Sequence, residues 1–92
     1  MRTPLFKLGT TVATRKVLTA LEQSNENVVE FLCRHAAGDW GNVGEEDTQS
    51  NEEAVLKGLR IVSAYHLKTG VQIYVITEAN RRSTCVMLAD EY

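Results

Sequence analysis

The side chain best suited to acid–base chemistry in this chain is His35, which stands just before a glycine-rich loop. We expect it at a helix C-terminus, where the helix dipole favours a charged imidazole and titration near neutral pH. In a metal-independent ribonuclease such a histidine would transfer the proton. The structural alternative is a histidine that caps its own helix and packs on Trp40.

Two arginines, Arg60 and Arg81, and two threonines would complete a ribonuclease site. Arg81 and Arg82 stand at a predicted hairpin tip, where guanidinium groups could bind phosphate or an acidic partner. Arg60 opens a predicted strand and would reach the same face. Thr77 and Thr84 flank the hairpin turn and would bind a phosphate oxygen. The structural alternatives are a solvated turn and a threonine pair that only packs across strands. The catalytic set under this hypothesis is His35, Arg60, Thr77, Arg81 and Thr84.

The loop Asp39–Gly44 holds the only tryptophan, Trp40. Trp40 would either stack on a base or fill the core beneath the loop, and Asp39 would cap a turn or pair with Arg34. Tyr65 lies on a predicted strand and would position a ligand. The candidate binding residues are Asp39, Trp40, Tyr65, Arg81 and Arg82.

The sequence predicts neither a metal site nor a cofactor. Its two histidines lack a second ligand at metal-binding spacing. The acidic run Glu45–Asp47 lacks the spacing of a calcium loop and is typical of a solvated helix start. No phosphate loop, nucleophile elbow or Cys–His nucleophile pattern occurs. Cys33 and Cys85 are expected to be reduced thiols.

The elements that must position these residues begin with helices, over about residues 14–58. Thr14 and Asn27 are predicted N-caps of the first two, and Ser50 with Glu53 forms a capping box for the third. Gly58 is the expected left-handed residue after the third helix. The predicted helices are Arg15–Gln23, Val28–Ala37 and Asn51–Lys57.

A sheet is predicted over about residues 60–88. Alternating residues and short turns predict a meander of Arg60–Leu67, Val71–Glu78 and Ser83–Leu88. Phe6–Ala13 would form a short strand or an extended arm. The fold class is therefore α+β, with two or three helices on one face of a three- or four-stranded antiparallel sheet. We also expect the Arg34–Trp40 segment to lie near the second turn of the sheet.

Length and composition limit the possible functions. Ninety-two residues predict a single domain, 1–92, and a net charge of −2 lacks the overall basic character of a nucleic-acid binder. No stretch resembles a signal peptide or a membrane span, so we expect a cytoplasmic protein without membrane contact.

The strings RHAAGDWG (34–41), RIVSAY (60–65), YVITEANRRSTCVML (74–88) and the terminal EY resemble a family of small uncharacterised proteins. Bacterial plasmids, phages and integrated elements carry its members, which are labelled "plasmid-related protein" or type I restriction methylase subunit. The resemblance implies a mobile-element origin without an established activity. The methylase label conflicts with the sequence, which has one proline and no Asn/Asp-Pro-Pro-Tyr/Phe site. More loosely, helices followed by a meander bearing His, Arg, Thr and Tyr resemble barnase-like and toxin ribonucleases.

We therefore expect a small accessory or interaction protein of a bacterial mobile element that binds a host or element protein. Its predicted contact surfaces are the acidic segment Glu45–Glu53 and a sheet face, and an exposed sheet edge would permit a homodimer. The alternative is a metal-independent, toxin-like ribonuclease acting on RNA, although such enzymes are usually basic. A DNA-binding accessory role has least support, because the first two predicted helices offer only Arg15, Lys16 and Arg34 as basic residues.

Overall fold

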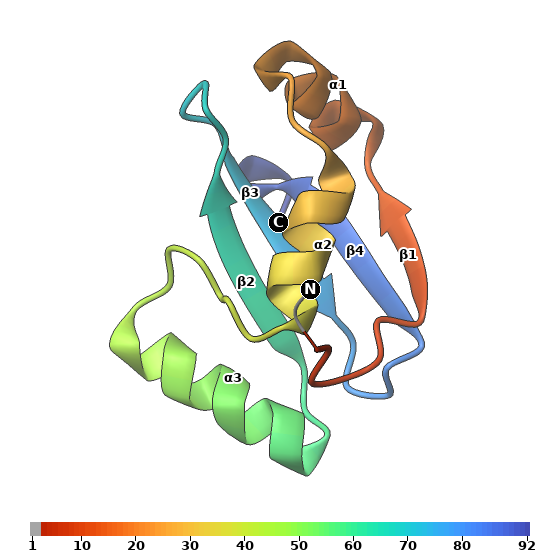
Figure 1. Cartoon of the computed structure of the whole chain (residues 1–92), viewed down its shortest axis with the longest axis vertical. Coiled ribbons are helices and arrows are strands. Elements are labelled where there is room, and N and C mark those ends of the chain that lie inside the picture. Colours follow the sequence, from red (N-terminus) through yellow and green to blue (C-terminus); the bar gives the residue numbers. More distant parts are fainter. Residues whose placement is uncertain (1–2) are drawn as a thin grey trace.

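The computed structural model describes residues 3–92, which form a four-stranded sheet and three α-helices. Helices α1 and α2 lie on one face of the sheet, and α3 lies beside the β2 edge (Figure 1). None of the helices within residues 3–92 has the length and apolar character needed to cross a bilayer. The elements are β1 Thr10–Ala13, α1 Arg15–Ser24, α2 Val28–Ala36, α3 Glu45–Lys57, β2 Ile61–His66, β3 Gln72–Thr77, β4 Ser83–Leu88 and the short 3-10 helix η1 Ala89–Glu91.

The sheet has the strand order β1-β4-β3-β2. Strands β2, β3 and β4 form the predicted antiparallel meander, and Thr77 lies opposite Thr84 as expected. Strand β1 pairs with β4 in parallel, so the sheet is mixed and the prediction of a wholly antiparallel sheet was wrong at this strand. Sequence patterns over a few residues determine hairpins. The direction in which β1 pairs with β4 depends instead on the course of the whole chain between these two strands.

The helices form where their capping residues predict. The Thr14 side chain accepts a hydrogen bond from the Val17 amide at 3.1 Å, and Asn27 accepts one from the Val29 amide at 2.9 Å. Each cap satisfies an amide that the first helical turn leaves unpaired. The apolar faces of α1 and α2 pack on the inner face of the sheet through Val17, Ala20, Leu21, Phe31, Tyr65, Ile73, Val75 and Val86.

Helix α3 begins at Glu45, well before the predicted start at Asn51. Ser50 therefore lies inside the helix, and its interpretation as an N-cap was wrong. The acidic run that opens α3 suits the positive end of the helix dipole, which explains the earlier start. The helix ends at Gly58, whose φ of 70° is left-handed as predicted.

The edge of β2 is covered by other parts of the chain. The Asn51 side chain donates to the Val62 carbonyl at 2.8 Å and accepts from the Val62 amide at 3.2 Å. Next to it, Gly41 forms a parallel bridge with Ala64. A β-carbon on Gly41 would lie 2.1 Å from the Ala64 carbonyl oxygen, so glycine permits this approach. The opposite edge, β1, has one strand neighbour and no such cover among residues 3–92.

Candidate functional site

Four buried side chains form one hydrogen-bonded chain across the inner face of the sheet. His35 of α2, Ser63 of β2, Thr77 of β3 and Thr84 of β4 are each 0% exposed. His35 Nδ1 lies 2.5 Å from Ser63 Oγ, and His35 Nε2 lies 2.9 Å from Thr77 Oγ1. Thr77 Oγ1 lies 2.7 Å from Thr84 Oγ1, which donates to the Leu8 carbonyl at 2.7 Å.

The directions of these hydrogen bonds determine which nitrogen of the His35 ring carries a proton. A carbonyl oxygen only accepts, so the Thr84 proton goes to Leu8 and the Thr77 proton goes to Thr84. Nε2 of His35 must then donate to Thr77, which leaves Nδ1 to accept from Ser63. Burial, together with the positive charge of Arg81, lowers the pKa of His35 from 6.5 to about 4. The imidazole is therefore neutral at physiological pH.

The structure thus brings together three residues of the predicted ribonuclease set, His35, Thr77 and Thr84. A general acid or base must come within hydrogen-bond reach of its substrate, and none of these side chains is exposed. In the folded chain they join a helix, three strands and the N-terminal arm (residues 3–9, ahead of β1). Their catalytic role stays a prediction. Ser63 was not singled out from the sequence, although a hydroxyl on the buried side of a strand needs a partner.

Arg81, another member of that set, holds the end of α3 to the β3–β4 turn. Its Nη2 donates to the Ala54 carbonyl at 2.7 Å, and its Nη1 donates to the Leu59 carbonyl at 2.6 Å. Nη1 also contacts two carbonyls of its own turn. A guanidinium that meets several carbonyls at a helix C-terminus stabilises that end. These contacts engage both terminal nitrogens of the guanidinium, which would otherwise be free to hold a phosphate.

Phe6 links this turn to the segment that contains His35. The Arg81 guanidinium lies 5.5 Å from the Phe6 ring centre, and the Phe6 and His35 rings lie 5.2 Å apart. The Phe6 ring also stacks with Trp40 at 6.2 Å. The prediction that Arg34–Trp40 lies near the second turn is therefore confirmed.

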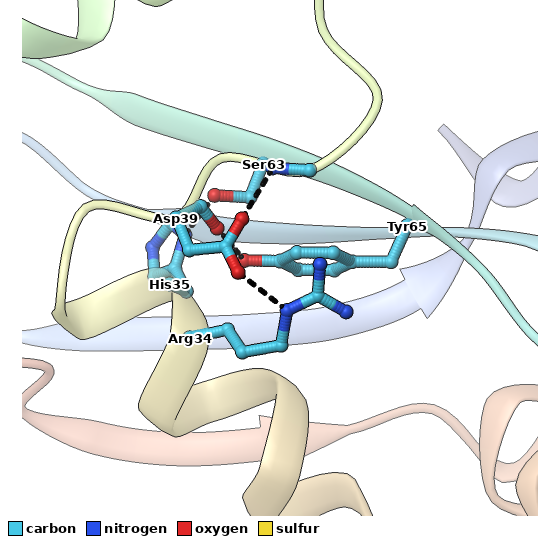
Figure 2. A network of polar contacts seen from close by, with 6 residues as sticks. Arg34, His35, Asp39, Ser63 and Tyr65 are labelled. Atoms are coloured by element: carbon cyan, nitrogen blue, oxygen red, sulfur yellow. Dashed lines mark hydrogen bonds and ion pairs between the residues drawn. The ribbon is translucent and has the colours of Figure 1, made fainter. Parts of the chain in front are cut away.

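Asp39 and Tyr65 take part in a second polar network, shown in Figure 2. Arg34 Nε donates to Asp39 Oδ2 at 2.7 Å, which confirms the predicted pair, and the Tyr65 hydroxyl donates to the Asp39 carbonyl at 2.6 Å. The Arg34 guanidinium lies 4.5 Å from the Tyr65 ring centre. Its hydrogen bond to Asp39 raises the pKa of Arg34. This network holds the loop after α2 onto β2.

Trp40 fills the core beneath the loop, one of the two predicted roles. It is 5% exposed and packs with Ala54 and Ile61, so its ring is not open to a base. Its Nε1 is buried and has no hydrogen-bond acceptor within residues 3–92. Arg82 is the member of the candidate binding set that lies exposed at the surface.

The outer face of the sheet carries the remaining member of the ribonuclease set. Arg60 lies over the Tyr92 ring at 5.1 Å, and that ring meets Tyr74 at 5.6 Å. Tyr74 is on the opposite face of β3 from Thr77, so Arg60 is separated from His35 by the sheet. A cavity of about 350 Å³ lies beside these two tyrosines.

A groove lies between the N-terminal arm and α2, and sequence reasoning missed it. Its volume is about 280 Å³, and a second hollow of about 550 Å³, which shares the lining residues Pro4, Leu8 and Ala36, extends to Thr11 of β1. The helix residue Val29 is 56% exposed, and Leu5 of the arm is 54% exposed. The groove is lined by Pro4, Leu8, Val29, Leu32, Cys33 and Ala36. The apolar residues of the arm were the available signal in the sequence. The groove could not be predicted from them alone, because it forms only where the arm and α2 lie side by side.

Comparisons with protein-family models, curated proteins and solved structures give no match. Within residues 3–92 there is also no group of three or more His, Cys, Asp or Glu side chains able to hold a metal ion. The buried polar networks join elements of the fold, while the β1 edge and the groove lie at the surface.

Proposed function

We propose that this protein is a protein-binding module that takes an extended segment of its partner beside β1 and in the groove between the arm and α2. The observation that carries the proposal is the open edge of β1 next to an apolar groove. An added strand obtains affinity from main-chain hydrogen bonds, and pockets for alternate side chains provide specificity. The role fits an accessory protein of a mobile element that binds a host or element protein.

The backbone of β1 supports this mode of binding. The Thr10 amide donates to Arg82 and the Thr14 amide donates to Val86, so alternate amides face β4. The amides and carbonyls of Thr11 and Ala13 then point away from β4, because the direction alternates along a strand. These groups can pair with a further strand. The covered β2 edge offers no equivalent set.

The groove supplies the side-chain part of the same site. An extended segment beside β1 places every second side chain toward the helix layer, where the groove wall is apolar. Burial of one large aliphatic side chain there would contribute roughly 1.5–3 kcal/mol. The partner is therefore expected to carry such side chains at alternate positions.

The test is a selection of random peptides on the purified protein, followed by measurement of dissociation constants. Thr11→Pro should weaken the selected peptides at least tenfold, because it removes an outward donor while sparing the β4 ladder. Val29→Glu should weaken them similarly by placing a charge at the groove. Leu56→Glu is the matched control, since Leu56 is 86% exposed on α3. Selection of no peptide, or equal binding by all variants, would contradict the proposal.

A further inference from the structure

Charged residues are unevenly distributed along this chain, and strand β1 belongs to an N-terminal segment that has basic but no acidic residues. The first 21 residues contain Arg2, Lys7, Arg15 and Lys16 and no acidic residue. All 12 acidic residues follow from Glu22 onward. A protein with a net charge of −2 therefore presents its open strand within an acid-free segment.

Three cations near this edge form no ion pair with the carboxylates that the structure describes. Lys7 and Arg15 flank β1 in the sequence, and Arg82 lies opposite its start, where the Arg82 carbonyl accepts from Thr10. All three are exposed, and no ion pair within residues 3–92 involves them. Lys16 is different, because it interacts with Glu91, which also accepts a hydrogen bond from Thr14. Like charges at both ends of one strand edge favour an acidic ligand there.

We infer that the segment bound at β1 is an acidic strand of a different protein, with aliphatic side chains at alternate positions and Asp or Glu between or beside them. This inference rests on the proposed function. Its aliphatic side chains would enter the groove beside Val29, and its carboxylates would meet Lys7, Arg15 and Arg82.

The same charges argue against a second copy of the chain as occupant. Two β1 strands related by a two-fold axis would pair antiparallel. Lys7 of one copy would then lie near the Arg15 end of the other, and like charges across a strand pair are destabilising. A homodimer through this edge is accordingly disfavoured.

The experiment compares two synthetic ten-residue peptides with valine at alternate positions, one with glutamate and one with lysine at the positions between. Binding to the full chain is measured by fluorescence polarisation and mapped from amide NMR shifts. The glutamate peptide should bind at least tenfold more tightly at low salt and shift the amides of Thr11 and Ala13. The difference should shrink in 1 M salt, where charges are screened within about 3 Å.

Charge-reversed variants locate the effect. Lys7→Glu, Arg15→Glu and Arg82→Glu combined should remove the preference for the glutamate peptide, whereas Lys68→Glu at the β2–β3 turn should retain it. If both peptides bind equally and shift the β1 amides, the binding module stands and the acidic specificity is overturned. If neither peptide shifts those amides, the proposed function itself fails. Concentration-dependent dimerisation through β1 would also overturn the inference.

Discussion

The buried imidazole of His35 should make the protein less stable in mild acid than at neutral pH. Its pKa is lowered from 6.5 to about 4 by burial and by the positive charge of Arg81. As the pH falls below 6.5, the unfolded chain takes up this proton before the folded chain does. The stability contributed by the neutral ring is therefore complete above about pH 6.5, is lost between pH 6.5 and about 4, and changes no further below that range.

The magnitude follows from the difference between the two pKa values. One pKa unit corresponds to about 1.4 kcal/mol, so the full loss is about 3 kcal/mol. Between pH 7 and pH 5 the loss is about 2 kcal/mol, which corresponds to a fall of roughly 10 °C in Tm for a domain of this size. Total stabilities of small domains are about 5–15 kcal/mol, so this single proton matters.

The assay is urea unfolding followed by Trp40 fluorescence at half-unit steps from pH 7 to pH 4.5. His35→Gln should lower stability at pH 7 and should also flatten the pH dependence by about 2 kcal/mol between pH 7 and pH 5. His66→Gln, which removes the exposed histidine, is the matched control and should keep the wild-type slope. Equal slopes for wild type and His35→Gln would refute the reasoning, as would an NMR titration of His35 near pH 6.5.

Three further substitutions, two of them paired with a control substitution, test the packing around the loop, the turn and the sheet edge, all by urea unfolding. Gly41→Ala should lower the free energy of unfolding by about 3 kcal/mol or more, and Gly58→Ala by only about 1 kcal/mol. Both glycines have a positive φ, but only at Gly41 would the added β-carbon meet backbone atoms. Equal losses would contradict the close approach of Gly41 to β2. Arg81→Lys should lower the free energy of unfolding by about 1–3 kcal/mol, because lysine cannot reach several carbonyls at once. Arg82→Lys should lower it by less than about 0.5 kcal/mol. Similar losses for the two variants would contradict a stabilising role of the Arg81 guanidinium. Asn51→Ala should cost about 2 kcal/mol through loss of both hydrogen bonds to β2, and an unchanged midpoint would show that this edge is covered without it.

Much of the fold could be predicted because its elements depend on neighbouring residues. Thr14 and Asn27 cap helices through amides two or three residues away, and Gly58 ends α3 through its own backbone conformation. The hairpin that joins β3 to β4 brings Thr77 opposite Thr84. Such interactions act over a few residues, so sequence patterns report them directly.

The start of α3 was missed although it is also local. Ser50 and Glu53 have the spacing of a capping box, but the acidic turn from Glu45 begins the helix earlier. Where two local patterns compete, packing against the rest of the chain selects one.

The sequence by itself determined the α+β class, the two N-terminal helices and the antiparallel meander, because periodicity, caps and turns are local properties. Only the tertiary structure decided that β1 pairs in parallel with β4, that His35 is sealed inside a hydrogen-bonded chain and that Arg81 binds carbonyls. It also decided which sheet edge is covered and which is open. Each of these depends on contacts between residues far apart in the chain, and such contacts form only when the whole path of the backbone brings them together.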